Sequence, residues 1–313
     1  MRVGVIDVGT NSIHLLIGQL GLNGRFRVLR KERELTRLGE GGLARNRLTV
    51  AAMHRAIEVL RRYAAILTRA RADHIEAVAT SAVRDAVNGS AFIRRVRRQL
   101  RLPLRVIGGR EEARLIYLGV LYAHRFRRAS LLVMIGGGSA QVVCGDGAKL
   151  RYAASVPLGG ARLAQRFIRH NPPQPQELDA LQEDIIRRWR PLLRQVRRHR
   201  WARALGSSAT IAQVMVAGYG LTHHRLPGKA QPLSISRSAL RRLIAWLAHS
   251  TAAQRIQLPG LDPRREDLAL PTAVALWVWM EGCGISTLRY ASGSLREGLV
   301  LDYVGRQAGR RVT

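Results

Sequence analysis

Two short turns of small residues, 9–12 and 136–139, constrain the fold of this chain more than any other feature. Each begins with glycine and ends with serine, and runs of apolar residues precede and follow it. This pattern is typical of two β-strands joined by a tight turn. Because glycine and serine recur at the same spacing in both halves, we interpret the chain as an internal duplication.

The turns also predict phosphate binding. Glycines 136–138 permit close approach of a ligand to the main chain, and amide N–H groups in such turns commonly form an anion-binding concavity. A pair of turns in register is similar to the two phosphate-gripping hairpins of actin-like phosphotransfer proteins. We therefore expect an α/β chain with a duplicated actin-like (ribonuclease H-like, sugar kinase/Hsp70/actin superfamily) two-domain fold and an interdomain cleft. The expected domains are 1–124 and 125–297, with the last helix, about 298–313, packing back on the first.

The charge of the chain favours an anionic ligand. Lysine and arginine number 52 against 21 acidic residues, for a formal net charge of +31, and the only lysines are Lys31, Lys149 and Lys229. Mutational bias in a GC-rich genome explains arginine in place of lysine, but it leaves the small number of acids unexplained. A field of this sign attracts polyphosphate, nucleic acid or an anionic membrane. Nucleic acid is the weaker candidate, since no pattern of stacking aromatic residues accompanies the arginines.

Cysteine use and hydropathy predict a cytoplasmic protein. Cys144 and Cys283 lie far apart in apolar surroundings, which favours buried thiols in a reducing compartment over a disulfide or a metal cluster. The first residues lack a secretory apolar segment. The longest apolar run, 268–280, contains Pro271 and is too short to cross a bilayer, so we expect no membrane span.

Periodicity predicts strands and helices in alternation. Thr49 precedes a long amphipathic segment and is expected to cap a helix. The other strands are expected at 26–38, 74–80, 104–107, 131–135, 140–144, 150–157, 201–205 and 286–291. The other helices are expected at 110–119, 159–170, 177–196, 236–248 and 264–281.

Two charged positions at expected helix starts allow two interpretations each. Arg84 follows the strand at 74–80 and either contacts a phosphate at a helix N-terminus or pairs at the surface with Asp85 or Glu76. Glu111 and Glu112 open the next helix, where acids are stabilised by the helix dipole. One of them can instead point into a cleft as a general base.

Residues 206–210 form a third candidate anion site. Gly206, Ser207 and Ser208 lie between a short strand and a helix, although serine at such a position is most often a simple cap. The adjacent His223 and His224 lack the spacing of metal ligands.

Six motifs in order resemble the exopolyphosphatase and guanosine pentaphosphate phosphatase (Ppx/GppA) family, in its short two-domain form. The resemblance runs nearly from end to end. The motifs are Ile-Asp-Val-Gly-Thr-Asn-Ser (6–12), Ala-Thr-Ser-Ala-Val-Arg-Asp (79–85), Glu-Glu-Ala-Arg-Leu-Ile-Tyr-Leu-Gly (111–119), Ile-Gly-Gly-Gly-Ser (135–139), Gly-Ser-Ser-Ala-Thr-Ile (206–211) and Leu-Arg-Glu-Gly (295–298).

The resemblance implies Mg²⁺-dependent hydrolysis of a terminal phosphoanhydride bond, in polyphosphate or in pppGpp, by an attacking water. Carried over to this sequence, Glu112 is the general base and Asp7 helps to hold the metal. The partners expected are polyphosphate or guanosine pentaphosphate and tetraphosphate, with non-specific binding of other polyanions, and the chain is expected to be a homodimer. The phosphate-binding residues implied are Thr10, Asn11, Ser12, Arg84, Gly136, Gly137, Gly138, Ser139, Gly206, Ser207 and Ser208.

Two residues depart from the family's second turn, Asp-Ile-Gly-Gly-Gly-Ser-Thr-Glu. Met134 and Gln141 occupy the positions of its two acids, and Ser292 stands where an acid often precedes the last motif. A thioether is a poor ligand for Mg²⁺ and an amide is weaker than a carboxylate. The sequence therefore leaves two hypotheses: a phosphoanhydride hydrolase, or a catalytically impaired protein that binds polyphosphate or an alarmone.

Overall fold

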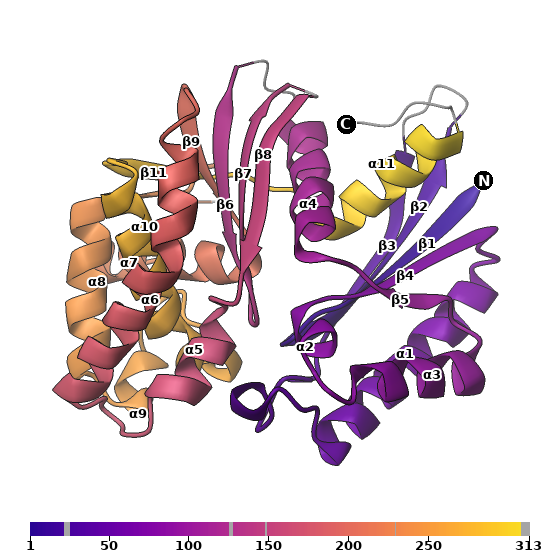
Figure 1. Ribbon diagram of the computed structural model, residues 1–313, viewed down its shortest axis with the longest axis horizontal. Coiled ribbons are helices and arrows are strands. Elements are labelled where there is room, and N and C mark those ends of the chain that lie inside the picture. The colour runs from indigo at the N-terminus through magenta and orange to yellow at the C-terminus, as the bar shows by residue number, and fades with distance from the viewer. Residues whose placement is uncertain (22–25, 125–127, 148, 229, 308–313) are drawn as a thin grey trace. The chain divides into compact units, whose positions relative to one another are not determined.

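The chain forms two compact α/β units in a computed structural model (Figure 1). The first unit comprises Met1–Ala123 and Gly293–Thr313, and the second comprises His124–Ser292. The structure describes residues 1–21, 26–124, 128–147, 149–228 and 230–307.

The first unit is built on a five-stranded sheet of order β3-β2-β1-β4-β5. Strand β1 is antiparallel to β2 and parallel to β4, while β3 and β5 extend the sheet at either side. The strands are β1 (Arg2–Val8), β2 (Ser12–Leu20), β3 (Phe26–Leu35), β4 (His74–Ala79) and β5 (Leu104–Val106).

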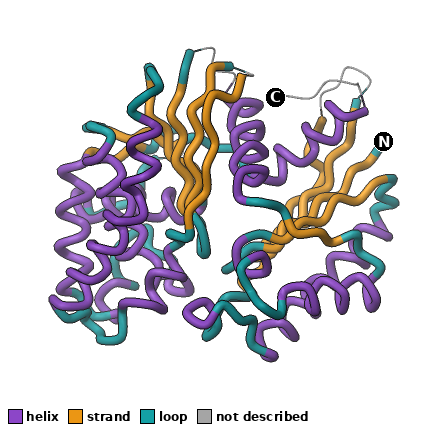
Figure 2. Tube along the Cα trace, in the orientation of Figure 1, coloured by secondary structure: helices purple, strands orange, loops and turns teal. Residues whose placement is uncertain are grey.

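Helices cover both faces of this sheet (Figures 1 and 2). Helices α1 and α3 lie against one face, and α11 lies against the other, packing on β1 and β2. Thr49 caps α1 as expected, because its side chain accepts a hydrogen bond from the amide of Ala52. The helical segments are η1 (Leu43–Arg45), α1 (Val50–Arg69), α2 (Ser81–Arg84), α3 (Gly89–Leu100), α4 (Gly109–His124) and α11 (Leu295–Gln307).

The second unit repeats the topology of the first, which confirms the α/β class and the duplicated actin-like fold. Its sheet has the order β10-β11-β9-β6-β7-β8, with β6 antiparallel to β7 and parallel to β9. Strands β6, β7, β8, β9 and β11 thus correspond to β1 to β5, and β10 is an additional edge strand. The strands are β6 (Ser130–Ile135), β7 (Ala140–Asp146), β8 (Lys149–Val156), β9 (Arg203–Ser207), β10 (Ser234–Ser236) and β11 (Thr287–Tyr290).

Helix α10 lies at the centre of the second unit. Most of its side chains are buried, as expected for a helix that is apolar on every side, and it packs on α6, α7 and α8. Trp189 of α6 contacts Trp279 of α10 and donates a hydrogen bond to the carbonyl of Ala275. The helical segments are α5 (Gly160–Phe167), α6 (Pro175–Val196), α7 (Ala209–His223), α8 (Arg237–His249), α9 (Ala252–Arg255), η2 (Pro263–Leu268) and α10 (Ala269–Gly282).

Two expected helices begin elsewhere. The segment expected as one helix at 264–281 is the 3₁₀ helix η2 followed by α10. The last helix begins at Leu295, and residues 308–313 of the expected range lie outside the described residues. Cys144 and Cys283 are both free thiols. No helix in the described ranges is long and apolar enough to cross a membrane.

Glycine allows α4 and α11 to approach each other closely. A Cβ atom on Gly298 would lie 1.8 Å from the carbonyl oxygen of Leu115, and one on Gly119 would lie 2.1 Å from that of Ser294. Both obstacles are backbone atoms, which cannot rotate away. The glycines that end two of the sequence motifs are therefore required by helix packing.

We predict that Gly298→Ala destabilises the protein by about 2–3 kcal/mol or more, because α11 must move away from α4 to admit the methyl group. Gly108→Ala is the matched control, since a Cβ there meets no atom within 4 Å. Urea denaturation should give a lower midpoint for the Gly298 variant alone. Equal midpoints for the two variants would mean that the helix contact is loose.

Candidate active site

The first turn, Gly9–Ser12, has its carbonyl groups bonded to a neighbouring segment. The amides of Arg37 and Gly39 donate to the carbonyls of Asn11 and Thr10, at 2.9 Å each. Within the described residues the backbone amides of Thr10 and Asn11 have no acceptor, and the side-chain nitrogen of Asn11 is buried without a partner. Unpaired donors in a buried turn favour an anionic ligand.

The second turn, Gly136–Ser139, is arranged in the same way. Gly136 donates to the carbonyl of Ser139 at 2.9 Å, as Gly9 does to Ser12 at 3.0 Å. The three glycine carbonyls accept bonds from the amide of Gly160 and from the amide and side chain of Arg162. In the described chain the amides of Gly137 and Gly138 have no acceptor, so this turn too presents free donors.

The segments that bond to the two turns, 37–39 and 159–162, were not singled out in the sequence. A Cβ atom on Gly159 would lie 2.3 Å from the backbone of Gly137, so only glycine permits this contact. The pair Gly159-Gly160 directly after the strand at 149–156 was the available signal. No comparable signal marks residues 37–39, because their role is performed by backbone amides alone.

The third candidate turn brings β9 and β6 of the second unit together. The side chain of Ser208 caps α7 by accepting from the amide of Ile211, and it donates to the carbonyl of Ile135 at 2.8 Å. Ser208 has a φ of 125°, a conformation that costs a non-glycine residue about 1–3 kcal/mol and is concentrated at functional sites. The turns at 136–139 and 206–208 therefore lie side by side at the ends of adjacent strands.

Arg84 and Glu112 form a partly buried ion pair in the first unit. The guanidinium of Arg84 donates to Glu112 Oε2 at 2.9 Å and to the carbonyl of Ile107 at 3.1 Å, and it lies 3.4 Å from Asp85. Glu112 is 5% exposed. The predicted ion pair between Arg84 and Asp85 is therefore present, beside the pair with Glu112. Glu76 pairs with Arg306 and not with Arg84.

Burial raises the pKa of Glu112 to about 7, although the Arg84 guanidinium opposes the shift. The carboxylates of Asp7 and Asp85 contribute further to the rise. A carboxyl that exchanges a proton near neutral pH is suited to general-base chemistry. Glu111, by contrast, pairs at the surface with Arg105 at 2.9 Å, so the two adjacent acids lie in different environments.

Asp7 is partly buried at the end of β1, with no hydrogen bond or ion pair from its side chain in the described residues. Burial raises its pKa to about 6, opposed by the charge of Arg296. Glu297 raises it further, and Glu297 itself accepts hydrogen bonds from Lys31 and Ser294.

Met134 and Gln141 lie opposite each other in the second unit. They are paired in the register of β6 and β7, and Met134 is also paired with Ser207 of β9. Gln141 is 1% exposed and its amide nitrogen donates to the hydroxyls of Ser139 and Ser155, at 2.8 and 3.2 Å. Of the two positions that are acidic in the resembled pattern, 141 therefore holds a neutral side chain in a hydrogen-bond network, and 134 holds a thioether.

The repeated sheet topology with its two glycine turns is the duplicated actin-like fold, and the chain belongs to the Ppx/GppA phosphatase family. The family model matches residues 19–307.

Two solved structures are similar over nearly their whole lengths. An exopolyphosphatase from Cytophaga hutchinsonii is 28% identical, with 100% of this chain and 99% of that chain covered and a TM-score of 0.88. The Aquifex aeolicus member of the Ppx/GppA family is 25% identical, with 98% of each chain covered and a TM-score of 0.79. A Haemophilus influenzae protein, provisionally named an exopolyphosphatase, is 27% identical over 96% of this chain and 90% of its own length.

We predict that Arg84→Leu destabilises the protein in a pH-dependent way. The pKa of folded Glu112 already exceeds its ordinary value of 4.5, so ionisation of Glu112 reduces stability as pH rises toward 7. Without Arg84 that pKa rises further and the loss continues above pH 7. The variant loses the hydrogen bond to the carbonyl of Ile107, which lowers its stability by the same amount at every pH. In addition, the difference in free energy of unfolding between the native protein and the variant should grow by about 1–3 kcal/mol between roughly pH 5 and pH 9.

Urea denaturation at several pH values measures this difference, and Arg105→Leu provides the control. Arg105 pairs with Glu111 at the surface, where an ion pair contributes about 0–1 kcal/mol. A pH-independent loss in the Arg84 variant would contradict the assignment of the coupled carboxyl to Glu112.

Proposed function

We propose that this protein hydrolyses a terminal phosphoanhydride bond, in inorganic polyphosphate or pppGpp, with Glu112 as the general base. The observation that carries the proposal is the buried carboxyl of Glu112, whose pKa of about 7 lets it accept a proton near neutral pH. Membership of the Ppx/GppA phosphatase family supports the reaction class, and the names of two relatives support polyphosphate as the substrate.

In this mechanism, ionised Glu112 accepts a proton from water as the water oxygen attacks the terminal phosphorus. The bond between that phosphorus and the bridging oxygen breaks, and the bridging oxygen leaves with the shortened chain. Arg84 orients the Glu112 carboxylate through the 2.9 Å hydrogen bond. Its positive charge also favours the negative charge that the transferred phosphoryl group carries.

Backbone amides supply the phosphate contacts in this proposal. Each glycine turn leaves amide donors unpaired within the described residues, and the N-terminus of α7 adds donors of the same kind. Ser12, Ser139 and Ser207 contribute hydroxyl groups. The side-chain nitrogen of Asn11, buried without a partner among those residues, is a further donor for a phosphate oxygen.

The residues present fit a Mg²⁺ ion held mainly by Asp7. The described residues include no group of three or more histidine, cysteine or acidic side chains able to hold a metal. Magnesium, however, is commonly bound by one or two carboxylates together with substrate phosphate oxygens and water. Asp7 offers such a carboxylate, free of other side-chain bonds in the described chain. When bound, the ion neutralises charge on the transferred phosphoryl group.

The pairing of Met134 with Gln141 favours a second candidate function. With no acid at either position, the second unit offers neutral groups beside its glycine turn. A protein of this kind binds polyphosphate or a guanosine alarmone and catalyses little or no hydrolysis. Binding to long polyphosphate should weaken steeply as salt rises, whereas a compact alarmone site depends less on salt.

We predict that Glu112→Gln lowers orthophosphate release from long-chain polyphosphate by about 10²–10⁴-fold, the usual contribution of a general base. Release should require Mg²⁺. In the native protein, kcat/KM should fall about tenfold per pH unit below the pKa of about 7, because protonated Glu112 cannot accept a proton.

Glu111→Gln is the control for this measurement, since it removes the same charge from the adjacent surface residue. Equal activity of the two variants would exclude Glu112 as the base. No release from any of the three proteins, with salt-sensitive binding intact, would support the binding function.

We predict that Met134→Asp combined with Gln141→Glu raises Mg²⁺-dependent phosphate release by roughly tenfold, because two carboxylates are better Mg²⁺ ligands than a thioether and an amide. The hydroxyls of Ser139 and Ser155 remain as partners for a carboxylate at 141. Met134→Asn is the control that adds polarity without charge. Unchanged turnover in the double variant, with Mg²⁺ still bound, would show that these positions do not limit the metal.

A further inference from the structure

Helix α6 of the second unit carries opposite charges at the two ends of one exposed face. Asp179 and Glu183 lie toward its N-terminus, Ile186 lies at the middle, and Arg190 and Arg194 lie toward its C-terminus. All five side chains are exposed. At 3.6 residues per turn they fall within a sector of about 80° around the helix axis. One face of a single helix therefore carries both partners of potential ion pairs.

The two acids on this face are unusual for this chain. Among the 21 acidic residues, only Asp7, Asp179 and Glu183 make no side-chain hydrogen bond or ion pair within the described residues. Asp7 belongs to the candidate active site. In a chain with 52 basic residues, two exposed acids without a cation suggest that their partners come from another molecule.

The neighbouring charges of α6 are already paired within the second unit. Asp184, which is buried, accepts hydrogen bonds from Arg187 and Arg188. Arg197 donates to the carbonyl of Gly282. Arg190 and Arg194 make no such bond within the ranges that the structure describes, so four side chains of the face remain available.

The positions of these four residues are symmetric along the helix. Asp179 and Arg194 are equally far from the midpoint between Ile186 and Arg187, and Glu183 and Arg190 are equally far from the same midpoint. If a second α6 crosses antiparallel at that point, each acid meets an arginine of the other copy. A two-fold interface requires this self-complementarity, because the same surface must serve on both sides.

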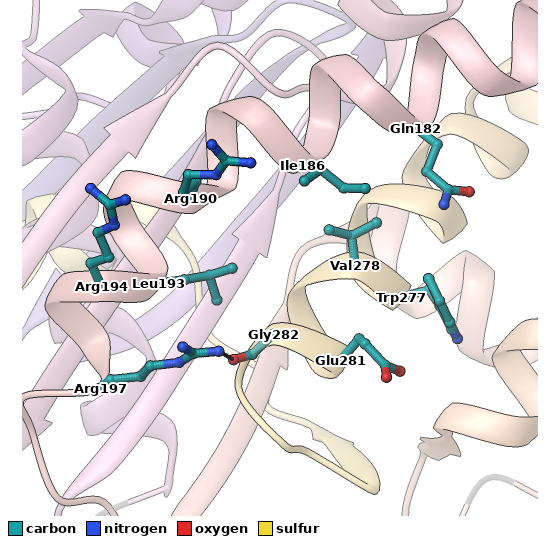
Figure 3. A pocket seen from close by; sticks show the side chains of 10 residues that line it. All are labelled: Gln182, Ile186, Arg190, Leu193, Arg194, Arg197, Trp277, Val278, Glu281 and Gly282. Atoms are coloured by element: carbon teal, nitrogen blue, oxygen red, sulfur yellow. Dashed lines mark hydrogen bonds between the residues drawn. The ribbon is translucent and has the colours of Figure 1, made fainter.

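An apolar hollow beside the midpoint supplies surface that association would bury (Figure 3). Its volume is about 480 Å³, and Ile186 and Leu193 of α6 line it together with Trp277 and Val278 of α10. Ile186 is 39% exposed. Glu281, at the edge of the hollow, already pairs with Arg237 and does not neutralise the arginines of α6.

We propose that this face of α6 is a homodimer interface, in which a second copy of the chain lies antiparallel across Ile186. Asp179 and Glu183 of each copy pair with Arg194 and Arg190 of the other. Ile186 of both copies lies near the two-fold axis, beside the apolar hollow. Two chains of charge +31 repel each other, but salt at physiological ionic strength screens this repulsion beyond about 8 Å. The ion pairs at the contact offset the repulsion that remains at shorter distances.

The test exchanges the charges in two separate variants. The first carries Asp179→Arg and Glu183→Arg, and the second carries Arg190→Glu and Arg194→Glu. Either variant places like charges opposite each other in its own homodimer, so its dissociation constant should rise by at least about a hundredfold. An equimolar mixture restores opposite charges at every pair and should form a heterodimer.

Sedimentation equilibrium measures the mass, which should be twice 34.8 kDa for the native dimer. Arg94→Glu with Arg98→Glu, a matched charge reversal on exposed residues of α3, should leave that dimer intact. Circular dichroism checks that each variant is folded. A monomeric native protein, a dimer that survives either exchange, or a mixture of folded variants that stays monomeric would each overturn the proposal.

Discussion

The hydrogen bonding of the two glycine turns is the constraint on which the candidate site depends. In each turn the carbonyl groups accept bonds from a neighbouring backbone segment, 37–39 in the first unit and 159–162 in the second. Since the carbonyls are occupied on one side, the amides face away without a partner in the described chain. A peptide plane that is fixed in this manner presents its donor to a ligand without further reorganisation. The need for close backbone approach also explains why Gly159 tolerates no side chain.

Burial raises the pKa values of two acids of the first unit, whereas the arginines near them lower these pKa values. Removal of Glu112 from water raises its pKa to about 7, and Arg84 limits the rise without abolishing it. Asp7 follows the same pattern, with Arg296 as the opposing charge and a pKa of about 6. The first unit thus contains two carboxyls with pKa values raised toward neutrality, and the charge of Asp7 contributes to the raised pKa of Glu112. Such a pair is suited to accept a proton and to bind a cation, which are the two tasks that phosphoanhydride hydrolysis assigns to acids.

Sequence reasoning predicted the structural features that depend on the local pattern of residues. The two turns, the cap at Thr49 and the order of strands and helices all follow from spacing and residue type, and the repeated sheet topology confirms the duplication. It did not predict contacts made by backbone amides, such as those of Arg37 and Gly39, since any residue supplies the same amide. Nor did it decide between the two interpretations of Arg84, because Glu112 lies 28 residues further along the chain. The 3₁₀ turn at Pro263–Leu268 was merged into one helix because its composition continues into α10.

The scarcity of acids makes their placement informative. In an arginine-rich chain, most acids have an arginine within reach. An acid with no partner among the described residues therefore lies where the fold keeps the arginines away, or where a group from another molecule can pair with it. Asp7 meets the first condition, because the strands around it partly bury its carboxyl beside the first glycine turn. Asp179 and Glu183 are exposed. The turn after Asp179 carries no arginine, and Arg187, four residues after Glu183, donates to Asp184 instead. Helix α6 is therefore organised to pair its buried acid internally and to leave its outer acids for a cation from outside the chain.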